Sequence, residues 1–116
     1  SLGFLSVGVL NLNNMRDIES DAMSNKLTLA VKMGKKKSKI YHISLILSAI
    51  IISLVFAILY YTSPWNLLFL VTYIPLGIHI KTIAFATHPD EYDNQLKILA
   101  LTTFAFSLLL GIGYIL

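Results

Sequence analysis

The chain has 116 residues, of which 56% are hydrophobic and 13% are charged, and its formal net charge is +3. A soluble domain carries about a quarter charged residues, so this composition argues against a soluble protein and favours an integral membrane protein. The absence of cysteine excludes disulfide bridges and thiolate metal sites. The basic residues gather in one segment instead of forming a stripe across a folded face, so we expect no nucleic-acid partner.

Residues 1–12 are apolar but too few to cross a hydrocarbon core of ~30 Å at ~1.5 Å per residue. We therefore interpret them as the end of a truncated transmembrane helix. The chain starts with Ser instead of Met, which fits the same interpretation. We expect the sequence to be a piece of a longer protein.

Residues 13–39 are polar and form the segment in which most basic residues lie. We expect a short helix carrying Asp17 and Asp21, then a turn, then a second short helix over 27–33 that ends at Gly34. Glycine accepts the left-handed conformation that is common after helix ends. The lysines that follow are expected to contact anionic membrane lipid. The basic residues of this segment are Arg16, Lys26, Lys32, Lys35, Lys36, Lys37 and Lys39.

Two long stretches, 40–80 and 98–116, contain no Asp, Glu, Lys or Arg. Uncharged apolar runs of about 18 or more residues are typical of membrane-spanning helices. The second helix contains Pro75 and Gly77, which predict a kink. The fold class is therefore predicted to be all-α, a polytopic transmembrane helical bundle. We expect its spanning helices at residues 40–61, 65–85 and 98–116.

The polar residues outside residues 13–39 receive structural interpretations. His42 and His79 lie within or beside spans, where a packed, hydrogen-bonded histidine is more common than a functional one. The stretch 87–95 is expected to be a polar loop in which the acidic side chains are solvated. Basic residues flank the cytoplasmic ends of spans, so 13–39 and 87–95 are predicted to be cytoplasmic and the C-terminus to lie outside.

Asn13, Asp17 and Asp21 are spaced four residues apart, which places them on one face of a helix. Mg²⁺ is usually bound by one or two carboxylates together with substrate phosphates. Arg16 and Lys26 add positive charge where a diphosphate would lie. The pattern favours metal-assisted ionisation of an allylic diphosphate. Two exposed acids on a short amphipathic helix would give the same spacing, so spacing alone leaves both interpretations open.

The segment NNMRDIESDAMSNKLTLAVKMG resembles the second aspartate-rich motif of the UbiA-type intramembrane prenyltransferase superfamily. The spans that follow, ending in DNQLKILALTTFAFSLLLGIG, resemble the same family. One departure is Asn25, where the family usually has Gly; Asn tolerates a left-handed backbone almost as well. The matching positions are Asn13, Asn14, Arg16, Asp17 and Asp21, then Lys26, Thr28, Leu29, Ala30, Val31 and Gly34.

The resemblance implies a fold of about nine transmembrane helices, of which this chain would supply the C-terminal part, in the bacterial inner membrane. It implies that Asp17 and Asp21 are catalytic and bind Mg²⁺. It also implies that Asn13, Arg16 and Lys26 bind the diphosphate of a polyprenyl donor. The closest branch prenylates the aromatic acceptor 1,4-dihydroxy-2-naphthoate in menaquinone biosynthesis.

The first aspartate-rich motif of that family is absent from the chain. We therefore expect the 116 residues alone to be inactive, because they carry only half of the metal site. The alternative hypothesis is a small helical membrane protein without catalytic activity, such as a transporter subunit or an assembly factor.

Overall fold

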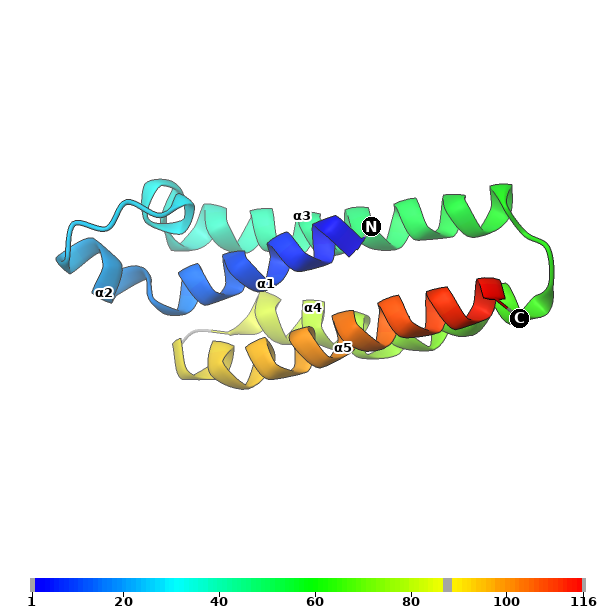
Figure 1. Cartoon of the computed structure of the whole chain (residues 1–116). Helices are drawn as coiled ribbons and strands as arrows, with labels where there is room; N and C mark the ends of the chain where they lie inside the picture. The colour runs from blue at the N-terminus through cyan, green and yellow to red at the C-terminus, as the bar shows by residue number, and fades with distance from the viewer. Residues whose placement is uncertain (1, 87–88, 116) are drawn as a thin grey trace.

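The computed structural model describes residues 2–86 and 89–115 and shows a bundle of helices (Figure 1). No strand occurs in these two ranges, which confirms the predicted all-α class. The chain runs along α3 away from the end that carries α2 and turns at the opposite end of the bundle. It returns through a 3₁₀ segment and α4, and α5 then crosses the bundle again. The elements are α1 (Leu2–Arg16), α2 (Ile18–Met23), α3 (Leu29–Leu59), η1 (Pro64–Thr72), α4 (Tyr73–Phe85) and α5 (Pro89–Ile115).

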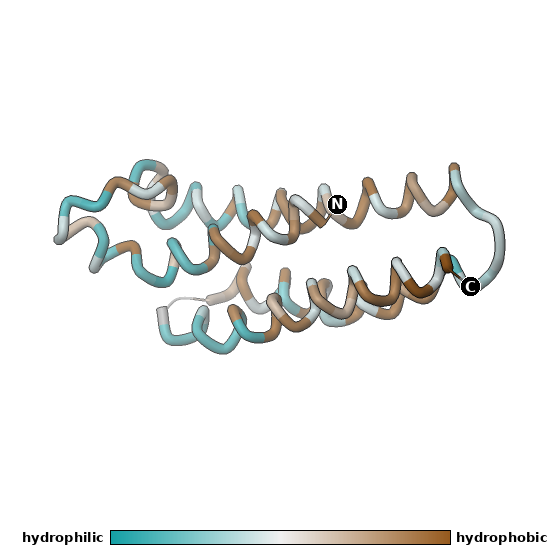
Figure 2. The backbone as a smooth tube through the Cα atoms, in the orientation of Figure 1, coloured by the Kyte–Doolittle hydropathy of each residue, from teal (hydrophilic) through white to brown (hydrophobic). Residues whose placement is uncertain are grey.

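Three helices are long and apolar enough to cross a membrane: α3, the continuous η1–α4 segment, and α5 over Asp90–Ile115. Only 33%, 28% and 22% of the residues in their most apolar windows are buried. Many large apolar side chains of these helices are therefore exposed, and Figure 2 shows that hydrophobic residues run along the helices away from the end that carries α2. Such a surface is stable against lipid or neighbouring helices, and the chain is an integral membrane protein.

Two helices begin earlier than the charge pattern predicted. α3 is interrupted at Gly34, so its long continuous part begins just after Gly34 instead of at residue 40, and α5 starts at Pro89. The expected loop is therefore wrong for residues 89–95, while residues 87–88 lie outside the described chain. Charges mark where a chain leaves the apolar layer, whereas backbone hydrogen bonding can continue into water. The sequence favours this start, because proline suits the first helical position and acidic residues suit the first turn.

The second membrane-crossing segment is irregular in its first half. Residues Pro64–Thr72 form a 3₁₀ helix, and α-helical geometry begins at Tyr73. The sequence predicted a kink at Pro75 and Gly77, and the structure instead changes helix type just before Pro75. Proline has no N–H to donate to the preceding turn, which weakens the α-helical pattern there.

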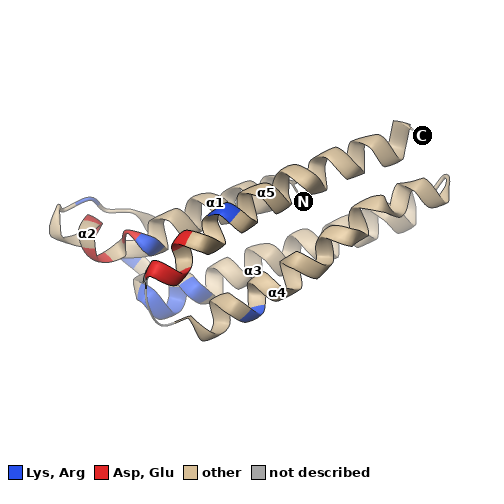
Figure 3. Ribbon diagram, turned by 90° about the horizontal axis from the view of Figure 1, so that it is seen from below, with Lys and Arg blue, Asp and Glu red and all other residues tan. Residues whose placement is uncertain are grey.

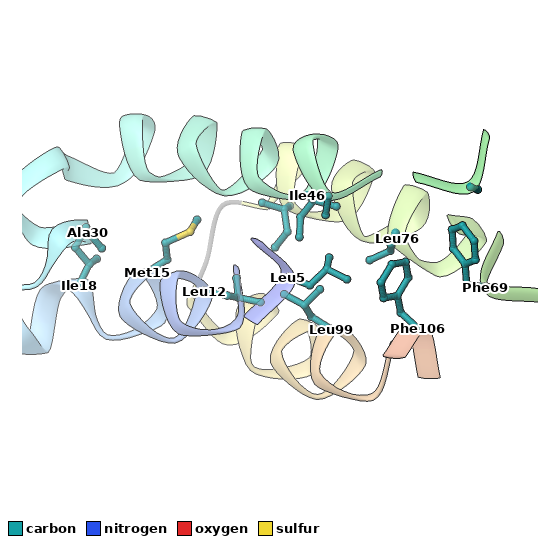
Figure 4. Packing of buried hydrophobic residues seen from close by; sticks show 13 residues of the cluster. Leu5, Leu12, Met15, Ile18, Ala30, Ile46, Phe69, Leu76, Leu99 and Phe106 are labelled. Atoms are coloured by element: carbon teal, nitrogen blue, oxygen red, sulfur yellow. The ribbon is translucent and has the colours of Figure 1, made fainter. Parts of the chain in front are cut away.

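The core consists of large apolar side chains contributed by all the long elements (Figure 4). α1 packs against both α3 and α5, and α5 packs along η1 and α4. The rings of Phe69 and Phe106 meet edge to face with centroids 5.5 Å apart, a favoured aromatic arrangement. Figure 1 shows α1 covering only the half of the bundle that adjoins α2. Residues buried in this core include Leu5, Leu12, Ile46, Leu76, Ile83 and Leu99.

Candidate active site at the charged end of the bundle

Most charged residues gather at the end of the bundle that carries α2, as the blue and red segments of Figure 3 show. Asn13 lies in the last turn of α1, Asp17 at the junction with α2, and Asp21 within α2. The amide of Asp17 donates to the Asn13 carbonyl at 3.2 Å, and that of Asp21 to the Asp17 carbonyl at 2.8 Å. Backbone hydrogen bonds between residues four apart thus continue through the junction, although Asp17 itself departs from helical geometry at φ −95° and ψ 12°.

Arg16 links two of these residues through its guanidinium group. Its Nη2 donates to Asn13 Oδ1 at 2.7 Å, and its Nε donates to Asp17 Oδ1 at 3.1 Å. A further bond from Nη2 reaches Asp17 Oδ2 at 3.3 Å. The structure therefore brings Asn13, Arg16 and Asp17 into direct contact. Asp21 lies one turn away, and its carboxylate has no side-chain partner within 2–86 and 89–115.

Asp93 is a site residue that the sequence interpretation missed, because it was assigned to a solvated loop. Its Oδ1 accepts a bond from Arg16 Nη1 at 2.8 Å, which joins α5 to the end of α1. Hydrogen bonds to Asp17 and then to Asp93 raise the pKa of the Arg16 guanidinium above its already high value. These contacts add to the preference of the guanidinium for its charged form, which every arginine keeps at physiological pH. The only sequence signal for Asp93 was its place near the end of a charge-free span.

The turn after α2 is closed by two backbone hydrogen bonds around Asn25. The Asn25 amide donates to the Ala22 carbonyl at 3.2 Å, and the Lys26 amide donates to the Asp21 carbonyl at 2.8 Å. With Asn25 in the left-handed region at φ 58°, these bonds form a Schellman motif. The Lys26 side chain is exposed and contacts no described carboxylate. The structure thus joins the Lys26 backbone to Asp21 through a hydrogen bond, without an ion pair between their side chains in the described ranges.

This geometry predicts how position 25 responds to substitution. Asn25→Gly should keep or slightly raise the unfolding temperature of the detergent-solubilised protein, because glycine adopts positive φ without a steric penalty. Asn25→Val should lower stability by about 1–2 kcal/mol, since a β-branched residue is strained there. Thermal unfolding of the two variants measures the difference, and equal stabilities would contradict the left-handed turn.

The second half of the polar segment attaches α2 to α3. Thr28 caps α3 by accepting a bond from the Val31 amide at 3.2 Å, and Gly34 interrupts the helix at φ 85°. The prediction of a short helix ending at Gly34 is confirmed, with its start at Leu29 instead of residue 27. Lys35 pairs with Glu19 at 2.5 Å, and this contact lowers the pKa of the Glu19 carboxyl.

The lipid-contact interpretation assumed that all the lysines after Gly34 face outward, and the structure differs at one of them. Lys39 is half-buried, and its Nζ donates to the Ala86 carbonyl at 2.6 Å. Ala86 is the capping residue at the end of α4, where a cation also suits the helix dipole. Lys36 and Lys37 are exposed and available to lipid.

A second polar cluster lies inside the bundle and consists of His42, His79 and Gln95, all buried. The Nε2 atoms of the two histidines are 2.8 Å apart, and His79 Nδ1 lies 2.8 Å from Gln95 Oε1. An amide oxygen only accepts, so His79 donates from Nδ1 and accepts at Nε2 from His42. This tautomer leaves His42 Nδ1 as an acceptor, and it has no partner among the described residues. Both histidines are packed and hydrogen-bonded, as the sequence interpretation expected.

The donor atoms at the charged end suit a hard divalent cation. Asp17 and Asp21 present carboxylates and Asn13 presents an amide oxygen, the ligand types that Mg²⁺ prefers. Within the described ranges, no group of three or more His, Cys, Asp or Glu residues could hold a metal by itself. Two carboxylates nevertheless match an ion whose remaining ligands are substrate phosphates and water. The residues present therefore fit part of a magnesium site.

Comparison with known proteins relates the chain to prenyltransferases. The chain is 34% identical to the 1,4-dihydroxy-2-naphthoate octaprenyltransferase of Haemophilus influenzae over 111 residues, which cover 96% of this chain and 36% of that protein. It is 38% identical to the Escherichia coli enzyme of the same name over 68 residues, 59% of this chain and 22% of that enzyme. The Mycobacterium tuberculosis enzyme of that name is 38% identical over 63 residues, 54% of this chain and 20% of the enzyme.

The chain thus spans about a third or less of the length of these relatives. No solved structure gives a significant match. The sequence profile of the UbiA prenyltransferase family matches residues 1–108, which is nearly the whole chain. Together with the helical membrane fold, this match shows that the chain belongs to the UbiA prenyltransferase family.

Proposed function

We propose that this chain is the C-terminal part of a Mg²⁺-dependent enzyme that transfers a polyprenyl group from its diphosphate to an aromatic acceptor. The acceptor suggested by the relatives' names is 1,4-dihydroxy-2-naphthoate. The supporting observation is the contact of Asn13, Arg16 and Asp17 at the one charged end of an apolar bundle. Membership of the UbiA prenyltransferase family supports the proposed metal dependence, because that family is generally metal-dependent.

The charged residues and the apolar helices would have different roles in this reaction. Asp17 and Asp21 would hold Mg²⁺, which when bound neutralises the diphosphate and stabilises the charge on the departing pyrophosphate. Arg16 and Lys26 would bind diphosphate oxygens and add to that stabilisation. The apolar helices behind the site would hold the prenyl chain and keep water from the allylic cation.

The distribution of basic residues orients the protein in the membrane. Seven of the chain's nine basic residues lie within residues 13–39, so we place the charged end in the cytoplasm, at the bacterial inner membrane. The 116 residues supply two of the carboxylates that the site needs. We therefore expect no prenyl transfer by this segment alone, and activity only when the remaining carboxylates are supplied by the complete enzyme.

An assay of the complete enzyme in membranes, with a labelled polyprenyl diphosphate as donor, tests this function. We expect prenylated product from 1,4-dihydroxy-2-naphthoate, at least about tenfold less from 4-hydroxybenzoate, and complete loss on metal chelation with recovery on adding Mg²⁺. Equal use of the two acceptors would contradict the acceptor assignment. Absence of any product would instead favour a membrane protein without catalytic activity.

A further inference from the structure

Arg16 is held from two sides by carboxylates of different helices. Its Nε and Nη2 edge faces Asp17 and Asn13, whereas Nη1 donates to Asp93 Oδ1 at 2.8 Å. A guanidinium group has five N–H donors, and these contacts occupy four of them. In this arrangement Arg16 therefore keeps little hydrogen-bonding capacity for a substrate.

Arg16 also covers the oxygen atoms that the proposed function needs. Asn13 Oδ1 and both carboxylate oxygens of Asp17 accept bonds from it. A divalent cation at Asp17 would bring a second positive charge to the same carboxylate, and the two charges repel. Arg16 cannot relieve this repulsion by losing its proton. Withdrawal of Arg16 from Asp17 would relieve the repulsion, and Arg16 would then need another anion as its partner.

Asp93 is fixed where it can serve as that anion. It lies near the start of α5, and Gln95 follows two residues later on the same helix. At 3.6 residues per turn, positions 93 and 95 point about 160° apart. Gln95 is buried against His79 of α4 at 2.8 Å. This contact fixes the rotation of α5 and leaves Asp93 facing the end of α1.

We propose that Asp93 is a positioning residue. When the hydrogen bonds from Arg16 to Asn13 and Asp17 break, the bond to Asp93 would keep the Arg16 guanidinium within the site. The released Nε and Nη2 edge would then be free to bind diphosphate oxygens in two parallel hydrogen bonds, the geometry that arginine favours with phosphate. This inference rests on the proposed function and adds a residue of α5 to the site. It assigns no contact between Asp93 and the substrate.

Binding measurements on the complete enzyme in nanodiscs test this role without turnover. Calorimetry would give the affinity for inorganic pyrophosphate in the presence of Mg²⁺, and the spin resonance signal of Mn²⁺ would give cation affinity without substrate. We expect Asp93→Asn to weaken both by about three- to tenfold. In turnover assays it should raise KM for the donor more than it lowers kcat. Asp93→Glu should recover most of both affinities.

Asp90→Asn is the matched control, because it removes the same charge one turn earlier on α5, where the side chain is exposed. It should leave both affinities close to those of the wild type. Unchanged affinities in Asp93→Asn, with only a lower unfolding temperature, would overturn the inference and leave Asp93 as a structural tie. Equal losses in the Asp90 and Asp93 variants would overturn it too, in favour of bulk charge. Failure of the wild-type enzyme to bind pyrophosphate would overturn the proposed function itself.

Discussion

Asp17→Asn in the complete enzyme is expected to reduce prenyl transfer by at least about a hundredfold. Asparagine keeps the shape of the side chain but removes the charge that a divalent cation needs. It also weakens the interaction of residue 17 with Arg16, whose Nε donates to Asp17 Oδ1 at 3.1 Å. The initial rate of product formation in membranes, measured over a range of Mg²⁺ concentrations, gives the size of the loss.

The protein should remain folded in this variant. The Asp17 side chain is 39% exposed, and ion pairs at that exposure contribute at most about 1 kcal/mol to stability. Glu19→Gln is the matched control, because it removes an acidic charge two residues away on an exposed side chain that pairs with Lys35. We expect that control to keep nearly full activity. Normal turnover by the membrane-inserted Asp17→Asn variant would contradict the assignment of Asp17 as a metal ligand.

A second large effect is expected where α5 meets η1. Gly113 is buried, and a Cβ atom added there would overlap the Trp65 carbonyl oxygen. That oxygen belongs to the backbone, so it cannot move aside as a flexible side chain would. The Gly113 carbonyl also accepts a bond from Asn66 Nδ2 at 2.9 Å, which depends on the same close approach. Small residues allow transmembrane helices to approach this closely.

Gly113→Ala should therefore destabilise the protein by about 1–3 kcal/mol through overpacking, even though alanine favours helix. Gly111→Ala is its control on the same helix, because a Cβ atom at Gly111 meets nothing within 4 Å. That variant should be neutral or more stable by up to about 1 kcal/mol. Thermal unfolding of both in the same detergent measures the difference. If the two variants unfold together, the close contact between α5 and η1 is not present in the membrane protein.

The sequence predicted some local features of the site correctly because they depend on nearby residues. Backbone hydrogen bonds link Asn13 to Asp17 and Asp17 to Asp21, as their four-residue spacing predicts, although Asp17 departs from helical geometry. Asn25 takes the left-handed conformation that the resemblance to a glycine position implied. The helix break at Gly34 was predicted for the same reason.

Helix boundaries near the charged end were predicted poorly. A change from apolar to charged residues shows where a segment leaves the membrane, but a helix does not have to end there. This is why the region of Asp93 was interpreted as a loop, although α5 already begins at Pro89. The exposed acidic side chains gave no sequence signal that would have separated Asp93 from Asp90.

The sequence by itself determined that the protein is helical and membrane-embedded, with a charged segment bearing an amide and two carboxylates at four-residue spacing. These features follow from composition and from spacings of a few residues. Only the tertiary structure decided that Arg16 meets Asp93, 77 positions away, and that His42, His79 and Gln95 meet inside the bundle. Such contacts depend on how helices are rotated against one another. That rotation is set by packing along the whole core, which no short stretch of sequence specifies.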